Sequence, residues 1–204
     1  MKERGMIFNE YQVRALLDGS MTQVRRPIKW KQTRFTEIGE REDGSYWPWS
    51  EDAEHACDFW HPCPFGAVGD RIWVREAFAS GLSTKSTLSY RATHKREDLE
   101  DGFYDTIKWT PSIHMPRWAS RILLEITDVR VERLNAISQE DAQAEGMELT
   151  GWRPTYSDPD GGGEVMTPYD NFAELWSSIY GDESWKANPW VWVISFKRVE
   201  GGAA

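Results

Sequence analysis

An almost continuous apolar run at residues 190–196 limits the folds open to this chain more than any other feature. Six of its seven residues are Trp, Val, Ile or Phe, and Ser195 is the exception. The run is far shorter than the roughly 18 apolar residues that a membrane span requires. An apolar segment of this length is typical of a strand buried on both faces. We therefore expect it to be the central strand of a sheet.

Capping residues predict three helices around this strand. Each start is marked by a capping residue with a polar partner three positions later: Asn9 with Gln12, Ser138 with Asp141, and Thr167 with Asp170. Further strands are predicted at 71–78, 88–92, 121–126 and 129–134, where β-branched and alternating residues gather. Strands with interspersed helices favour an α+β fold, here a small mixed β-barrel with about three helices.

The chain has the length of one domain, which we place at residues 1–200, followed by a flexible tail at 201–204. Residues 31–66 and 149–166 have an irregular composition and are interpreted as long loop insertions. The first residues contain charges but no apolar segment of the kind that secretory signals carry. We therefore expect a cytoplasmic protein without a membrane partner.

Charge is unevenly distributed along the chain. The net charge is −9, yet residues 1–41 contain nine Lys or Arg against five Asp or Glu, so this region has a net charge of +4. An acidic protein is a poor binder of long duplexes, because phosphate neutralisation supplies most non-specific affinity. A local basic segment is still sufficient to hold a few phosphates.

Two cysteines are too few for a disulfide framework, which agrees with a reducing compartment. His55, Cys57, His61 and Cys63 are zinc-type ligands, but they lie within nine residues, whereas structural zinc sites draw on two separated pairs. We expect no metal and no cofactor. The twelve Trp residues have two interpretations, either as filling for the core or as platforms on which bases stack.

Four stretches, at 15–26, 69–76, 138–147 and 190–197, are similar in order and composition to the ASCH family. The stretch 109–121, Trp-Thr-Pro-Ser-Ile-His-Met-Pro-Arg-Trp-Ala-Ser-Arg, resembles the version carried by phages and prophages. The chain thus resembles a phage-type ASCH protein, distantly similar to bacterial acetylcytidine amidohydrolases. The resemblance implies a PUA-like fold that recognises a nucleobase, free or in RNA.

The small bacterial members of the family remove the acetyl group of acetylcytidine with a Lys, a Thr and a Glu. The matching positions here are Met21, Val24 and Glu145. Met offers neither proton nor charge and Val has no hydroxyl, so two of the three groups are unsuited to amide hydrolysis. Glu145 remains as the catalytic acid or base, with Thr22 as a substitute hydroxyl on the same side of the segment as Val24.

Glu145 is expected in the last turn of the helix that begins near Ser138. The negative end of the helix dipole and the nearby Asp141 would both raise its pKa, which suits an acid or base. The alternative is a solvated surface carboxylate. Arg25 and Arg26 are predicted to clamp a phosphate or a carbonyl edge, against the alternative of a solvated basic turn.

The other candidate ligand-binding residues combine aromatic, basic and hydroxyl groups, as a base-binding pocket requires: Trp73, Arg75, Glu76, Trp109, Ser112, His114, Arg117 and Trp118. Arg75 and Glu76 are adjacent on one strand, so only one of them can point inward. For the loop at 109–121, the alternative is a segment folded over the end of the barrel by its Trp residues.

Three functions follow from these features. The first is recognition of a modified nucleoside or a short single-stranded RNA. The second is an amidohydrolase acting on acetylcytidine or a related nucleoside. The third is an adaptor that contacts a phage or host protein through its Trp-rich loops.

Overall fold

The computed structural model of the chain describes residues 1–29, 37–52, 57–80, 88–94, 107–147 and 166–199. The chain divides into two compact units. One contains Met1–Gly19, Phe65–Thr127 and Phe196–Ala204, and the other contains Ser20–Pro64 and Asp128–Ser195. His55, most of the insertion at 149–166 and the tail lie outside the described residues. The single domain at 1–200 stays a prediction.

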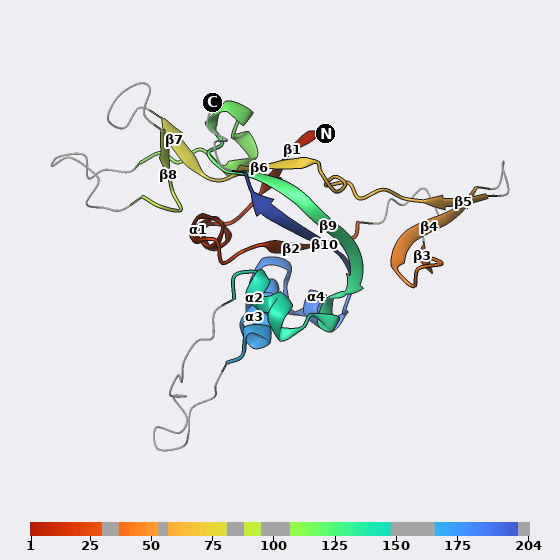
Figure 1. The fold of residues 1–204 in the computed structure, drawn as a ribbon. Helices are drawn as coiled ribbons and strands as arrows, with labels where there is room; N and C mark the ends of the chain where they lie inside the picture. The colour runs from red at the N-terminus through yellow and green to blue at the C-terminus, as the bar shows by residue number, and fades with distance from the viewer. Residues whose placement is uncertain (30–36, 53–56, 81–87, 95–106, 148–165, 200–204) are drawn as a thin grey trace, which may run out of the picture. The chain divides into compact units, whose positions relative to one another are not determined.

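The first unit combines one helix with short strands. Its elements are β1 (Glu3–Ile7), α1 (Glu10–Asp18), β6 (Arg71–Arg75), β7 (Phe78–Ser80), β8 (Leu88–Tyr90), the 3-10 helices η2 (Ser112–His114) and η3 (Arg117–Ala119), and the start of β9 (Leu123–Arg133). β1 runs parallel to β6, which pairs antiparallel with β9. β7 and β8 lie side by side as an antiparallel pair (Figure 1).

Local sequence sets the limits of α1, as predicted. The Asn9 side chain accepts a hydrogen bond from the Gln12 backbone, and the Gln12 side chain accepts one from the Asn9 backbone. Gly19 ends the helix with a φ of 83°, a left-handed conformation that costs glycine little. Val13 and Leu16, three residues apart, are buried, so one face of the helix packs into the unit.

The second unit contains two sets of strands and three helices. Its elements are β2 (Gln23–Pro27), β3 (Glu37–Glu40), β4 (Tyr46–Asp52), β5 (Cys57–Trp60), the rest of β9, η4 (Leu134–Ala136), α2 (Gln139–Ala144), α3 (Pro168–Tyr180), α4 (Asp182–Lys186) and most of β10 (Trp190–Arg198). β2 pairs antiparallel with β10, and β3, β4 and β5 form an antiparallel sheet of their own.

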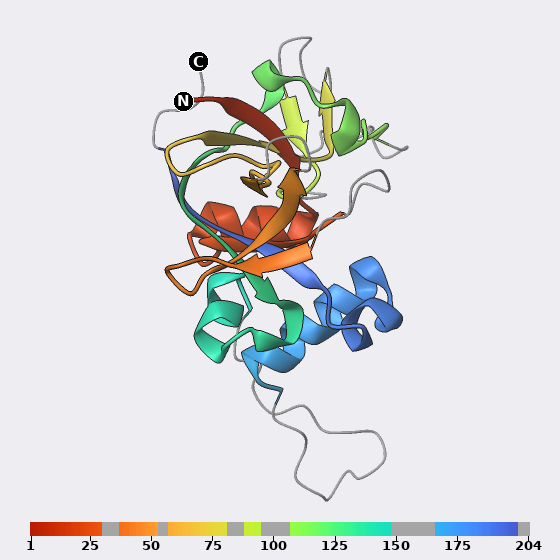
Figure 2. The ribbon, with the colours of Figure 1, turned by 90° about the vertical axis from the view of Figure 1, so that its right-hand side faces the viewer.

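The core of this unit forms where α3 packs against β10. Phe172 and Trp176, one helical turn apart, are buried together with Val191 and Val193. α2 and α3 lie side by side in both ribbon views (Figures 1 and 2), and the Tyr169 backbone donates a hydrogen bond to the Gln139 side chain. The apolar run at 190–196 is therefore buried, as its composition predicts.

The mixed α+β character is confirmed, and several boundaries differ from the sequence-based expectation. The largest sheet has the order β1-β6-β9-β10-β2, and no sheet of the described residues closes into a barrel. Most of the two segments 121–126 and 129–134 belongs to one strand, β9, which continues through Thr127 and Asp128. Residues 31–66 are not wholly irregular, since β3, β4 and β5 lie there. Among the described helices, none has the length and apolar composition needed to cross a membrane.

Candidate functional site

The second unit contains a buried cluster of charged side chains around Arg25. β2 places this arginine in the interior, where its side chain is fully buried. One guanidinium nitrogen, Nη1, donates to Glu145 Oε1 at 3.0 Å, and the other, Nη2, donates to Asp141 at 2.9 Å and Glu132 at 3.0 Å. Three carboxylates thus share one arginine, which is the arrangement that lets a buried cation remain charged.

A second arginine and an aromatic ring complete this cluster. Arg130, on β9, hydrogen-bonds to Glu132 and Asp141 and to the side chain of Gln23. The Arg25 guanidinium carbon lies 5.9 Å from the centre of the Phe172 ring, within the range of a cation–π contact. We call Arg25, Arg130, Glu132, Asp141 and Glu145 the charge cluster.

Glu145 is the most perturbed acid of the charge cluster. It lies at the C-terminal cap of α2, one residue past the position expected. Burial raises the pKa of Glu145 to about 7, even though the Arg25 guanidinium favours the charged form. The raised pKa agrees with the expectation, but its main cause is burial rather than the helix dipole. A carboxyl that changes its protonation near neutral pH has the basic property of a general acid or base.

The backbone brings Glu145 beside the segment that resembles the catalytic part of the family. Met21 and Glu145 form an isolated antiparallel bridge, and the Thr22 backbone donates to the carbonyl of Ala144 at 2.8 Å. Thr22 itself is exposed, whereas Val24 is fully buried, so burial does not follow the alternation of faces by which the two are expected to share a side. The regular alternation fails because Gln23, Val24 and Arg25 are all buried.

The first unit holds the loop at 109–121 in place by contacts along its length. Met115 and Ala119 are buried in a small core with Phe78. The Tyr90 hydroxyl donates to the Ala119 carbonyl at 2.9 Å, and the Ser120 hydroxyl donates to the Val74 carbonyl at 2.7 Å. These contacts hold the backbone of the loop against β6, β7 and β8.

Arg75 and two prolines add to this support. Arg75 donates hydrogen bonds to the carbonyls of Ser112 and Ile113, so its charge is used to hold η2. Pro111 and Pro116 precede η2 and η3, where a fixed φ favours the first turn of a helix. A rigid loop of this kind presents its outward side chains with little conformational freedom to lose on binding.

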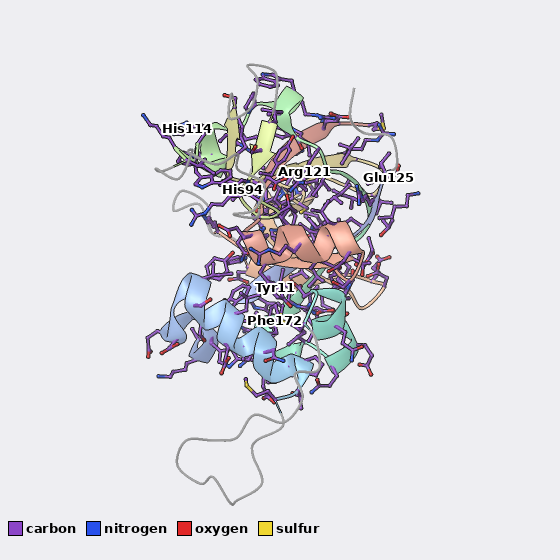
Figure 3. All side chains as sticks on the ribbon, turned by 90° about the vertical axis from the view of Figure 1, so that its left-hand side faces the viewer. Tyr11, His94, His114, Arg121, Glu125 and Phe172 are labelled. Atoms are coloured by element: carbon purple, nitrogen blue, oxygen red, sulfur yellow. The ribbon has the colours of Figure 1, made fainter. Side chains whose placement is uncertain are left out.

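The side chains that this loop leaves exposed include an aromatic and a basic residue, together with Ile113, which is 59% exposed. Trp118 is 68% exposed, and His114 is exposed as well. Figure 3 shows His114 at the margin of the molecule and Arg121 among the strands. Arg117 is ion-paired with Glu3 at 2.9 Å, which ties η3 to β1. We call Trp118, His114 and Arg117 the loop platform.

Two further predicted aromatic residues lie in the same unit. Trp109 is half-buried, and its ring meets that of His94 edge-on with centroids 5.5 Å apart. Trp73 is half-buried on β6, where the Arg75 guanidinium carbon lies 5.4 Å from the centre of its ring. Their rings are therefore occupied mainly by contacts within the unit.

Comparison with protein-family models, curated proteins and solved structures finds no match to the chain. The ASCH resemblance therefore rests on the sequence motifs and stays a prediction.

The structure resolves which of Arg75 and Glu76 points inward. Glu76 is 2% exposed and accepts two hydrogen bonds from Arg121, while Arg75 lies on the other side of the strand. Of the predicted site residues, Thr22, Arg25, Arg26 and Glu145 belong to the second unit, and the rest belong to the first. Among these residues, Arg25 contacts Glu145 in the second unit, and Arg75 contacts Ser112 in the first.

Sequence reasoning missed four residues that shape these two regions: Arg121, Arg130, Glu132 and Phe172. Arg130 and Glu132 alternate with apolar residues along one strand, a pattern normally typical of a solvent-facing side. The missing information was the buried Arg25 on β2, a strand that is separated from β9 by β10 in the sheet. Among the described residues no group of His, Cys, Asp or Glu is arranged to hold a metal ion.

Proposed function

We propose that this protein recognises a nucleobase, in a modified nucleoside or in short single-stranded RNA, through the loop platform. The observation that carries the proposal is the Trp118 indole, 68% exposed on a loop whose backbone is anchored by Arg75, Tyr90 and Ser120. An indole exposed on an anchored backbone offers its π-face to a base, and little backbone entropy is lost when the base stacks on it.

Stacking of one base on an aromatic side chain contributes about 1–3 kcal/mol. His114 and Arg117, in the same loop, supply donors for a base edge or for a phosphate. The acidic balance of the chain, −9 overall, limits such binding to a few nucleotides, because a long strand would meet net repulsion. The ligand class is therefore a single base or a short strand.

The test is titration of dye-labelled RNA and DNA hexanucleotides, followed by anisotropy, together with cytidine and acetylcytidine as competitors. Trp118→Ala should weaken binding about tenfold or more, and Trp118→Phe should retain most of it, because the π-face is kept. The control is Val68→Ala, in the same unit, since Val68 is 65% exposed but cannot stack. Equal binding by Trp118→Ala and the parent would overturn the proposal, as would a Trp118-dependent protein partner with no nucleotide binding.

We propose amide hydrolysis of an acetylated nucleoside as a second candidate, because the Glu145 carboxyl has a pKa of about 7. The bridge between Met21 and Glu145 places side by side two of the three positions that match the catalytic set of the family that the chain resembles. Purified parent, Glu145→Gln and Met21→Lys proteins are incubated with acetylcytidine, and deacetylation is followed by chromatography. Turnover that Glu145→Gln abolishes would support catalysis. Absence of turnover in the parent would leave recognition as the function.

A further inference from the structure

The three-stranded sheet of the second unit displays three indoles on one face. Trp49 lies opposite both Trp60 and Glu37 in the strand register, so these three side chains share a face. Trp47, two residues before Trp49, falls on the same face. Figure 2 shows β3 and β4 as an orange hairpin. We call Trp47, Trp49 and Trp60 the indole face.

A cation already lies on the indole face. The Arg41 guanidinium carbon is 4.1 Å from the centre of the Trp47 ring and 5.2 Å from the centre of the Trp60 ring. Both distances are within the range of cation–π attraction, which is stronger for Trp than for other rings. The geometry of this face is therefore suited to a planar guanidinium.

The rings are held in position by their neighbours. The Trp47 indole nitrogen donates to the His61 carbonyl at 2.7 Å, and the Trp49 nitrogen donates to Asp58 at 3.0 Å. A Cβ atom at Gly39 would lie 3.0 Å from the Trp60 ring, so glycine is needed for this ring to lie across the sheet. The π-faces are thus fixed before any ligand arrives.

Acidic residues surround these rings. Residues 37–60 contain eight Asp or Glu and a single basic residue, Arg41. Glu37, Glu51 and Asp58 are exposed and share the face of the indoles by register. Within the described part of the chain, no ion pair is formed by these three carboxylates. Such a surface repels phosphate and attracts cations.

We propose that the indole face binds an arginine-bearing segment of a partner protein. The partner's guanidinium would lie on Trp49 and Trp60, where Glu37, Glu51 and Asp58 supply opposite charge. Arginine is favoured over lysine because the cation that the face already accommodates is a guanidinium, whose plane stacks on an indole. Arg41 covers Trp47 and part of Trp60, so it competes with the partner for the same rings.

The experiment uses the full-length protein and a seven-residue peptide in which three arginines alternate with glycines, followed by calorimetry and indole fluorescence. The neutral control is the same peptide with citrulline in place of arginine. We expect binding by the arginine peptide that weakens with added salt, and about tenfold weaker binding by the citrulline peptide.

Variants separate the indole face from the rest of the sheet. Trp60→Ala should weaken binding about tenfold, and Arg41→Ala should tighten it by uncovering the part of the Trp60 ring on which Arg41 lies. The matched control is Phe59→Ala, because Phe59 is 43% exposed on the opposite face of β5 and should leave binding unchanged. The double substitution Glu37→Lys with Glu51→Lys tests the charges without removing a ring, so it remains informative if Trp60→Ala does not fold.

Three outcomes would overturn the proposal: equal binding of arginine and citrulline peptides, equal loss in Phe59→Ala and Trp60→Ala, or displacement of the peptide by a hexanucleotide. The inference does not depend on nucleobase recognition. Trp118→Ala should leave peptide binding unchanged, so failure of one proposal is distinguishable from failure of the other.

Discussion

Among the described residues, each unit buries one glutamate against an arginine, but the two pairs are built differently. In the first unit, Glu76 accepts two hydrogen bonds of 2.9 Å from Arg121, which also donates to Thr93 and lies 4.0 Å from the centre of the Tyr90 ring. In the second unit, Glu145 accepts a 3.0 Å bond from the Arg25 side chain and a second bond from the Arg25 backbone, and it shares this guanidinium with two other carboxylates.

The difference separates Glu76 and Arg121, which we call the closed pair because each satisfies the charge of the other, from the open charge cluster around Arg25. A bidentate pair satisfies both charges in a single geometry, so it fixes a strand and offers little further chemistry. In the charge cluster, the carboxylates outnumber the arginines, and the Arg25 Nε atom has no hydrogen-bond partner among the described residues. Burial then raises the pKa of Glu145 to about 7, and the carboxyl can exchange a proton near neutral pH.

Of the changes considered, removal of Arg25 should lower the stability of the protein most. Arg25→Ala leaves three carboxylates without their shared cation, one of them 4% exposed, and should lower the free energy of unfolding by about 3–5 kcal/mol. Urea denaturation at pH 7.5 measures the change. The control is Lys186→Ala, because Lys186 pairs with Glu183 at the surface of the same unit and should cost about 0.5 kcal/mol or less. A similar loss in both variants would show that the charge cluster does not stabilise the unit.

The parts that the sequence predicts well depend on residues close together in the chain. The helix start at Thr167 was predicted from Asp170, three positions later, and the structure confirms the reciprocal cap between them. The position of Glu145 at the end of a helix is likewise predicted from residues close to it in the chain. Local patterns of three or four residues contain all the information that such features need.

The parts that sequence reasoning missed depend on partners far apart. Arg25 and Glu132 are separated by 107 positions, and Arg121 and Glu76 by 45. No local pattern records which strand lies next to which. Arg25 was therefore predicted as a ligand clamp, yet its two terminal nitrogens are engaged by Glu145, Asp141 and Glu132. The sheet of β3, β4 and β5 was missed because Pro48 and the acidic residues obscure its alternation.

The pH dependence of stability tests whether Glu145 has the raised pKa that distinguishes the charge cluster. The folded protein binds the Glu145 proton more tightly than the unfolded chain, in which the ordinary pKa is 4.5. The contribution of this group to the free energy of unfolding is therefore full below pH 4.5 and is lost as pH rises through 7. Between pH 5 and 7.5 the parent should lose about 2 kcal/mol, and Glu145→Gln should lose clearly less. Parallel urea curves across this range test the difference, and equal slopes would mean that Glu145 is ionised throughout.

The smallest effect is expected from replacing the closed pair as a whole. Glu76→Leu alone leaves the Arg121 charge without its carboxylate partner and should lower the free energy of unfolding by about 2–3 kcal/mol. The double variant Glu76→Leu with Arg121→Met removes both charges, and Met keeps contact with the Tyr90 ring, so its stability should lie within about 1 kcal/mol of the parent. Thermal unfolding of the parent, the single and the double variants measures this.

The charge cluster allows no equivalent exchange, because five charged side chains from three elements would have to change together. A double variant as unstable as Glu76→Leu would mean that Arg121 acts through Thr93 and Tyr90 instead of through Glu76. The closed pair would then be no simpler than the cluster, and the raised pKa of Glu145 would be the only property that sets the two glutamates apart.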